Sequence, residues 1–216
     1  MTGPQLLKLA QQFMQTLVYL CSMTSTFNDE YWSGRYQAHN TLWNIGHASP
    51  PLTAYIDQLE DVHKKILIPG CGFAYEADYL LEKGFTDITL LDISSALTGV
   101  LQKKFRDKPV RIIHEDFFAH RETYDLVLEQ TFFCSLPPDK RKDYVSQLFD
   151  LLRPGATLAG VFFNRTFEDS PPYGSSRNEY QELFELKLFI KSMEPCYNSI
   201  PARQGSELFV ILKNIV

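Results

Sequence analysis

Short apolar runs alternate with amphipathic, helix-like stretches through the middle of the chain. The apolar runs cover residues 65–68, 87–92, 110–113, 124–128 and 157–163. Apolar residues at helical spacing predict a helix over 74–83, which Gly84 ends, and another over 94–105, which Ser94 caps. The same spacing predicts a third helix that ends at Leu152, before Arg153-Pro154-Gly155. Strands that alternate with helices of this length form parallel βαβ units, so the pattern predicts a doubly wound α/β sheet.

The C-terminal part departs from this alternation. Ser176 and Glu179 have the spacing of a capping box and predict a helix over 177–188. Two strand-like runs follow, over 189–197 and 207–213, joined by a loop too short for a helix, so they should pair as an antiparallel hairpin. We therefore expect a Rossmann-like, seven-stranded and mostly parallel sheet with a C-terminal hairpin and helices on both faces. This topology resembles that of class I S-adenosylmethionine-dependent methyltransferases.

The N-terminal residues show a separate helical pattern. Leu6, Leu9, Ala10, Phe13, Leu17 and Leu20 follow the i, i+3, i+4, i+7 rhythm of an amphipathic helix. The apolar run over 17–21 is too short to cross a bilayer, and the single cation Lys8 before it makes a poor signal peptide. We expect residues 1–27 to form a helical extension packed on a single domain of residues 28–216; a mobile lid is the alternative.

Composition narrows the functional classes. The chain of 216 residues has 21 Lys and Arg against 26 Asp and Glu, a net charge of −5, and lacks the basic stripe of nucleic-acid-binding proteins. Its basic cluster, Lys140–Lys142, lies between two aspartates and reads as the solvated start of a helix. Aromatic residues make up 13%, an excess that indicates an aromatic core or pocket. The four cysteines, with no metal-ligand spacing, predict free thiols, no metal site and a cytoplasmic protein; they are Cys21, Cys71, Cys134 and Cys196.

Three segments follow the predicted strands at the edge where an open α/β sheet binds its ligand. Gly70 and Gly72 after the first strand permit a sharp turn and a close backbone approach. Asp92 at the end of the second strand can accept both hydroxyls of a ribose. Asp116 after the third strand can accept the exocyclic amine of adenine while Phe117 stacks nearby. Together they predict an adenosine pocket; taken singly, the alternatives are a tight turn, a helix cap and a surface loop residue.

The glycine loop also separates two classes of adenosine cofactor. A nicotinamide site needs G-x-G-x-x-G, but Tyr75 occupies the third glycine position and opposes close docking of a pyrophosphate. S-adenosylmethionine has no phosphate and does not need that approach. Taken with the C-terminal hairpin, the loop favours S-adenosylmethionine as the cofactor.

Several separated motifs resemble one family. Trp32, Tyr36 and Trp43 resemble the W-x-x-x-W…T-P-W-D-x-G segment of the thiopurine S-methyltransferase superfamily, and residues 68–72 are similar to its L-V-P-G-C-G loop. The halide/thiol, or harmless-to-ozone-layer, branch has F-D-Y-V-F-F-C-A-I-x-P, G-G-P-P-Y and A-I-P-T-R-x-G-x-E motifs, which resemble residues 128–138, 170–174 and 199–207. The resemblance extends from about residue 30 to the C-terminus. It implies methyl transfer to a thiol, thiopurine, thiocyanate or halide.

The resemblance also implies roles for individual residues on the donor side. The rings of Trp32, Tyr36 and Trp43 would close over the donor, where an aromatic face stabilises a sulfonium by about 0.5–2 kcal/mol; ordinary core packing is the alternative. Glu129 and Gln130 stand where the branch has Asp-Tyr beside the donor, so we expect both to contact it. The change of Tyr to Gln130 alters that contact and bears on acceptor choice.

Methyl transfer from a sulfonium is an in-line displacement that needs alignment and a dry pocket rather than a metal. Tyr173, which Pro171-Pro172 holds in an extended loop, can donate a hydrogen bond that positions an anionic acceptor. Arg203 can attract that anion or pair with the donor carboxylate, with a surface arginine as the alternative. Cys134 has no histidine placed to activate it and reads as a packed thiol.

The sequence therefore predicts an S-adenosylmethionine-dependent methyltransferase acting on a small soft nucleophile, with S-adenosylhomocysteine as its product. The alternatives are a methyltransferase for another small molecule or a macromolecule, and a non-catalytic protein that binds these adenosyl ligands. We expect no nucleic-acid or membrane partner, and a monomer or weak homo-oligomer.

Overall fold

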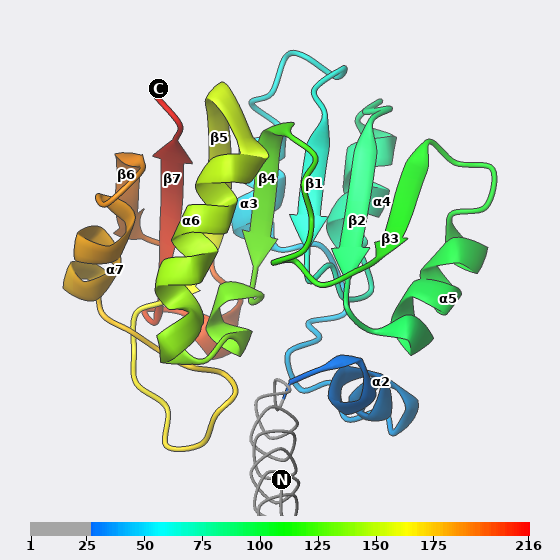
Figure 1. The fold of residues 1–216 in the computed structure, drawn as a ribbon, viewed down its shortest axis with the longest axis horizontal. Helices are drawn as coiled ribbons and strands as arrows, with labels where there is room; N and C mark the ends of the chain where they lie inside the picture. The colour runs from blue at the N-terminus through cyan, green and yellow to red at the C-terminus, as the bar shows by residue number, and fades with distance from the viewer. Residues whose placement is uncertain (1–26) are drawn as a thin grey trace, which may run out of the picture.

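The computed structural model describes residues 27–216, which form one seven-stranded sheet with helices on both faces (Figure 1). The strand order is β3-β2-β1-β4-β5-β7-β6, in which β1 to β5 are parallel and β7 runs antiparallel between β5 and β6. The predicted sheet and its C-terminal hairpin are confirmed. The strands are β1 (Ile66–Pro69), β2 (Ile88–Asp92), β3 (Val110–His114), β4 (Tyr124–Gln130), β5 (Leu152–Phe163), β6 (Phe189–Pro195) and β7 (Glu207–Lys213).

The helices divide between two cores, one on each face of the sheet. One face packs aliphatic side chains of α3, α4 and α5 against β1 and β2. The other packs an aromatic cluster around Phe133, whose ring centroid lies 4.9 Å from that of Tyr144 and 5.3 Å from that of Phe162. Much of the aromatic excess is therefore core. The helices are α2 (Asp29–Gln37), α3 (Pro50–Ile56), α4 (Tyr75–Glu82), α5 (Ser95–Lys104), α6 (Arg141–Leu151) and α7 (Arg177–Phe184), with short 3₁₀ turns η1 (Phe133–Ser135), η2 (Pro138–Lys140) and η3 (Pro201–Arg203).

The chain reverses its direction of travel across the sheet between β1 and β4. From β1 the strands proceed to β2 and β3 on one side, and from β4 they proceed to β5 on the other. This reversal leaves a crevice beyond the carboxyl ends of the parallel strands, where open α/β sheets bind ligands. Figure 1 shows α2 and the loop after β5 lying beyond that same edge.

The pattern of hydrophobic residues did not predict two of the helices, α2 and α3. In α2 only Ser33 is buried, so the helix has no apolar stripe to detect. Its signal is a cap: Asn28 Oδ1 accepts from the Tyr31 N–H at 3.0 Å, and the acidic pair 29–30 occupies the first turn. The signal for α3 is Ser49 followed by Pro50-Pro51 at its first two positions.

Three predicted boundaries were wrong. Helix α6 ends at Leu151 and β5 begins at Leu152 rather than residue 157, because Leu152 pairs with β4 and its carbonyl accepts from Asn214 Nδ2 at 2.8 Å. Helix α7 ends at Phe184 rather than 188; the remaining residues form a turn closed by the Leu188 N–H on the Phe184 carbonyl. Strand β6 ends at Pro195 rather than 197, and after it the Cys196 N–H makes one more bond to β7, to the Glu207 carbonyl at 2.9 Å.

The local capping signals were reliable. The Ser94 hydroxyl accepts from the Leu97 N–H at 3.2 Å, and Ser176 and Glu179 form the predicted capping box. The prediction that residues 1–27 form a helix concerns a segment that, apart from Phe27, lies outside the described residues. Within residues 27–216, no helix is long and apolar enough to cross a membrane.

Candidate functional site

A cavity of about 1270 Å³ opens at the carboxyl edge of the sheet. Its walls come from α2, the ends of β1 to β4, the loop after β5, and η3. Pockets for one drug-sized ligand are about 300–1000 Å³, so this cavity has room for two molecules side by side. It brings together most of the predicted site residues: Trp32, Tyr36, Trp43, Gly70, Asp92, Asp116, Phe117, Tyr173 and Arg203.

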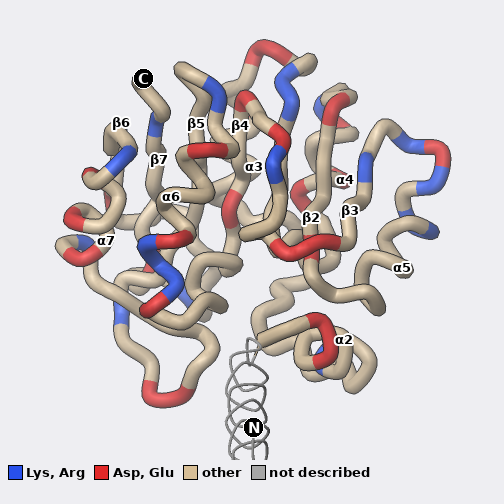
Figure 2. The backbone as a smooth tube through the Cα atoms, in the orientation of Figure 1, with Lys and Arg blue, Asp and Glu red and all other residues tan. Residues whose placement is uncertain are grey.

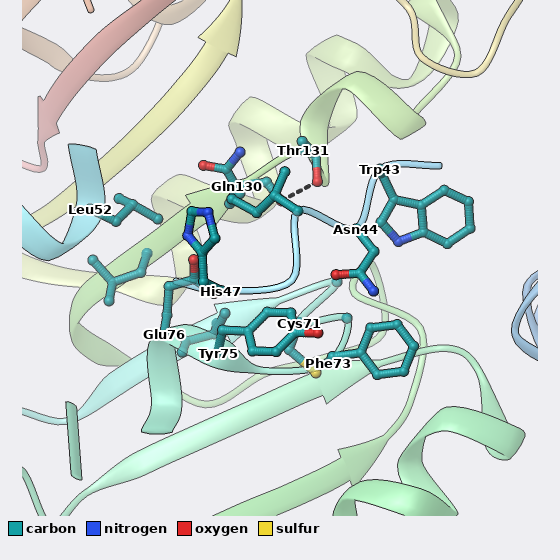
Figure 3. A pocket seen from close by; sticks show the side chains of 15 residues that line it. Trp43, Asn44, His47, Leu52, Cys71, Phe73, Tyr75, Glu76, Gln130 and Thr131 are labelled. Atoms are coloured by element: carbon teal, nitrogen blue, oxygen red, sulfur yellow. Dashed lines mark hydrogen bonds between the residues drawn. The ribbon is translucent and has the colours of Figure 1, made fainter. Parts of the chain in front are cut away.

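A second cavity of about 50 Å³ adjoins the first, and Trp43, Gly70 and Thr131 line both. Figure 3 shows His47 and Gln130 on one side of this small cavity and Tyr75 on the other. The buried Oε1 of Gln130 has no hydrogen-bond partner among the described residues. The two cavities meet at the glycine loop.

The glycine loop follows β1 in a conformation that favours glycine. Gly70 has φ +55° and Gly72 has φ +51°, both in the left-handed region. A Cβ at Gly70 would overlap the ring of Phe132 and lie 2.8 Å from its Cγ. At Gly72 the nearest atom to such a Cβ is the Tyr36 hydroxyl, 3.8 Å away, so this glycine leaves backbone accessible from the cavity side.

Asp92 lies at the end of β2 with 7% of its surface exposed. Its Oδ1 accepts from the Ser94 N–H at 2.9 Å. Burial raises the pKa of Asp92 to about 6, although the N–H groups of Ser94 and Gly72 oppose the shift. Tyr36 faces it: burial and the nearby Asp92 raise the pKa of the Tyr36 hydroxyl, which also accepts a hydrogen bond from Trp43. Above about pH 6 this carboxylate adds a buried negative charge to the cavity wall.

Aromatic rings form one wall of the large cavity. Trp43 meets Trp32 and Tyr36 edge-to-face, with centroid distances of 5.5 and 5.7 Å. Sequence reasoning missed the residues that hold α2, the helix carrying two of these rings. Asp29 Oδ1 accepts from the Ser95 N–H at 2.8 Å, and the Ser33 hydroxyl lies 2.9 Å from that of Ser94. Only contacts between residues more than sixty positions apart reveal these roles.

The segment after β3 has one exposed and one buried member. Asp116 is exposed and its Oδ1 accepts from the Phe118 N–H at 2.9 Å. Phe117 belongs to the aromatic core, stacked on Tyr144 at 5.3 Å, and also lines the cavity. A buried His120 holds the segment from behind, with Nδ1 2.7 Å from Glu115 Oε2.

Glu129 is the predicted site residue that lines neither cavity. It is fully buried, and its Oε1 accepts from the Phe133 N–H at 2.7 Å. Its Oε2 has no partner among the described residues, and burial raises the pKa of this carboxyl to about 8. The side chain therefore fixes the turn after β4 instead of facing the cavity.

Replacing Glu129 with Gln should change how stability depends on pH. The pKa of Glu129 rises from 4.5 to about 8 on folding, so the folded state keeps a proton that the unfolded chain releases. Stability of the parent protein is therefore lost as pH rises from about 5 to about 8, and Gln removes this loss. We expect the free energy of unfolding of Glu129→Gln, measured in urea and compared with that of the parent protein, to gain more than about 1.4 kcal/mol over that pH range. A pH-independent difference, like that expected for exposed Glu182→Gln, would contradict this.

The loop after β5 carries Tyr173 and is fixed at both ends. Asn164 and Arg165 bridge to Ser175, and the Tyr173 N–H donates to the Cys134 carbonyl at 2.6 Å. Arg141 Nη2 donates to the Gly174 carbonyl at 2.9 Å, so the prediction that this arginine is part of a solvated helix start was wrong. The base of the loop buries the guanidinium against η1, where it lies 5.4 Å from the Phe133 ring centroid.

Arg203 lines the large cavity but already has partners. Its Nη2 donates to the Trp43 carbonyl at 3.0 Å, and its Nη1 lies 3.4 Å from Glu207 Oε1. The guanidinium also lies 5.3 Å from the ring centroid of Phe163.

Cys134 has the predicted character of a packed thiol, because burial raises its pKa far above the ordinary value.

Comparison with known proteins decides which family this site serves. The thiopurine S-methyltransferase sequence model matches residues 27–207, most of the described chain. The chain belongs to the thiopurine S-methyltransferase family. Family membership and the seven-stranded fold together make the protein an S-adenosylmethionine-dependent methyltransferase.

Individual relatives and folds agree with membership of the thiopurine S-methyltransferase family. Thiocyanate methyltransferase 1 of Arabidopsis thaliana is 25% identical over 190 residues, covering 84% of this chain and 83% of the relative. Probable thiol methyltransferase 2 of the same plant is 28% identical over 159 residues, 70% of each chain. The solved Burkholderia thailandensis 1,6-didemethyltoxoflavin-N1-methyltransferase, with bound 1,6-didemethyltoxoflavin and S-adenosylhomocysteine, has a TM-score of 0.70 at 16% identity over 87% of each chain.

Proposed function

We propose that the protein transfers the methyl group of S-adenosylmethionine to a small soft nucleophile, a thiol, thiopurine, thiocyanate or halide. The observation that carries the proposal is the large cavity beside the glycine loop, which has room for two ligands and places Asp92 and aromatic rings on its walls. The names of the plant relatives, a thiol and a thiocyanate methyltransferase, support this substrate class.

The residues present fit the donor. The Asp92 carboxylate would accept ribose hydroxyls, and the segment 116–117 would border an adenine beyond β3, since all three residues line the large cavity. Trp32 and Trp43 would face the sulfonium. The amino-acid end of the donor would extend past Gly70 toward the small cavity, which Gln130 lines.

When bound, S-adenosylmethionine supplies an electrophilic methyl group open to in-line displacement, leaving S-adenosylhomocysteine. The chain has to exclude water and align the acceptor with that carbon, and the aromatic wall serves the first task. Tyr173, on a loop fixed to Cys134, serves the second by donating its hydroxyl hydrogen to the acceptor anion. Such a displacement requires no metal, so we propose none.

We further propose a cytoplasmic protein, a monomer or weak homo-oligomer, with no nucleic-acid or membrane partner. Residues 1–27 would form an extension to the single methyltransferase domain of residues 28–216.

Two measurements test the proposed function in sequence. Calorimetry with S-adenosylmethionine and S-adenosylhomocysteine should show binding of both; no binding at millimolar concentration would reject the donor. Incubation with iodide, thiocyanate, bisulfide, thiophenol and mercaptopurine should then yield a methylated product of at least one. Intact donor binding without any such product would reject the acceptor class and leave a binding protein or another substrate.

Replacing Tyr173 with Phe should slow turnover while leaving the donor in place. Losing one hydrogen bond to an anion costs about 1.5–3 kcal/mol, so kcat/KM should fall roughly 10- to 150-fold. The dissociation constant of S-adenosylhomocysteine should stay unchanged. Tyr197, which is 85% exposed, provides the control through Tyr197→Phe. Equal activity of the two variants would remove the Tyr173 hydroxyl from the site.

A further inference from the structure

Charge is uneven along the large cavity, and apart from its two ends Asp139, Asp143 and Asp150 of η2 and α6 also line it. Asp92, Glu115 and Asp116 line its donor end, and Figure 2 shows acidic residues gathered where β2 and β3 end. Arg165 and Arg203 line the opposite end, beyond β5 and in η3. A negative end complements a cationic sulfonium donor, so the positive end is suited to an anionic acceptor.

Most cations on the cavity wall are already engaged. Arg203 is held by Trp43 and Glu207 as described above. Arg35 Nε donates to the Asn40 carbonyl at 3.0 Å, and its guanidinium lies 5.1 Å from a Trp43 ring centroid. Lys140 Nζ lies 3.6 Å from Asp143 Oδ2. The two arginines therefore keep fewer free N–H donors for a ligand, and the exposed Lys140 pairs with a nearby aspartate.

Arg165 differs from them. Its single protein hydrogen bond among the described residues runs from Nε to the carbonyl of the next residue, Thr166, at 3.4 Å. No carboxylate of the described chain lies within ion-pair distance of it. The acidic loop tip, Glu168 and Asp169, is absent from the cavity lining. Arg165 is exposed, so the terminal N–H groups of its guanidinium face solvent and have no acceptor among residues 27–216.

The structure also holds Arg165 in place before any ligand arrives. Its backbone bridges to Ser175 at the base of the loop. Its guanidinium lies 4.7 Å from the Phe167 ring centroid, and Phe167 in turn packs edge-on against Phe163 at 5.0 Å. A guanidinium stacked on a ring keeps its N–H edge for bidentate binding and loses little entropy when a carboxylate docks.

We propose that Arg165 binds a carboxylate-type anion on the methyl acceptor, which makes it a specificity-determining residue. The inference rests on the proposed function and narrows its substrate class. Phe163, Phe167 and Tyr173 line the same end of the cavity and suit a planar aromatic frame. The acceptor is thus an aromatic molecule that carries both a soft nucleophile and a separate anionic group.

The test compares thiophenol with 4-mercaptobenzoate, which differ by one carboxylate. With the protein saturated by S-adenosylhomocysteine, calorimetry should show 4-mercaptobenzoate binding at least about tenfold more tightly than thiophenol. Arg165→Gln should abolish that preference and leave thiophenol affinity within about twofold. Arg165→Lys keeps the charge but loses the paired N–H donors of the guanidinium, so it should retain part of the preference for 4-mercaptobenzoate. Arg153, an exposed arginine outside the cavity lining, provides the matched control through Arg153→Gln.

Failure of this inference differs from failure of the proposed function. A preference that survives in Arg165→Gln, no preference in the parent protein, or equal losses for both thiols would overturn the assignment of Arg165. Under each of those results methylation of thiophenol with S-adenosylmethionine would still support the proposed function. Absence of methylation of every acceptor in the panel, with donor binding intact, would reject the proposed acceptor class and with it the role of Arg165.

Discussion

Asp92→Ala is expected to weaken S-adenosylmethionine binding by about 2–4 kcal/mol, a factor of roughly 30 to 1000 in Kd. In the proposed function the buried carboxylate at the end of β2 accepts hydrogen bonds from the ribose hydroxyls, and its 7% exposure limits replacement by water. Removing it forfeits hydrogen bonds to an ionised group, which are stronger than those between neutral groups. Isothermal titration at pH 8, above the raised pKa of about 6, measures the loss.

Two further variants separate donor binding from folding. Asp92→Asn keeps an oxygen for the Ser94 N–H but loses the charge, so its affinity should fall between those of the parent and the Ala variant. Asp87→Ala removes an exposed carboxylate just before the same strand, where we expect no effect. Thermal unfolding without ligand reports any loss of structure. If a folded Asp92→Ala protein binds within about threefold of the parent, this carboxylate does not hold the donor.

The strands could be predicted because their signals are local, whereas the strand order was not predicted and comes from the structure. The four residues of β1 and the five of β2 are all buried, as strands covered on both faces of a parallel sheet must be, so they appear as short continuous apolar runs. Caps such as Ser94 and the Ser176–Glu179 box mark helix starts within four residues. Boundaries that depend on distant partners, such as the pairing of Leu152 with Tyr124, lay beyond such signals.

The donor side could be predicted in part for a similar reason. A residue directly after a strand lies at a known edge of the sheet, which placed Gly70, Asp92 and Asp116 correctly on the cavity. Helix α2 could not be located this way, because polar contacts from Asp29 and Ser33 to the start of α5 hold it instead of an apolar face. The aromatic excess was ambiguous since Phe117 serves core and cavity together.

Glu129 lines neither cavity, although its neighbours along β4 do. Successive side chains of a strand point to opposite faces, and Leu128 and Gln130 on either side of it line the small cavity. Glu129 therefore points away from that cavity, toward Tyr144 of the aromatic core, and its raised pKa makes stability fall as pH rises. Its predicted contact with the donor stays a prediction. For Arg141 the basic neighbours in the sequence predicted a solvent-exposed side chain. In the structure its guanidinium instead donates to the Gly174 carbonyl at the base of the loop after β5.

Gly174→Ala is expected to disable the acceptor side and spare the donor side. A Cβ at this position would overlap the Arg165 carbonyl oxygen and lie 2.8 Å from the carbonyl carbon, so backbone would have to move. The base of the loop would open, shifting both Tyr173 and Arg165. A displacement of about 1 Å costs roughly 100-fold in rate, so we expect kcat/KM for the best acceptor of the panel to fall by at least that factor.

The donor side provides an internal control for Gly174→Ala, because the glycine loop and Asp92 lie on other strands. Affinity for S-adenosylhomocysteine should stay within about threefold of the parent. Gly99→Ala is the matched control: nothing lies within 4 Å of its Cβ position in α5, so it should preserve activity and stabilise the helix by about 0.5–1 kcal/mol. Parent-like turnover by a folded Gly174→Ala protein would show that the loop base tolerates the extra methyl, and that the placement of Tyr173 does not limit methyl transfer.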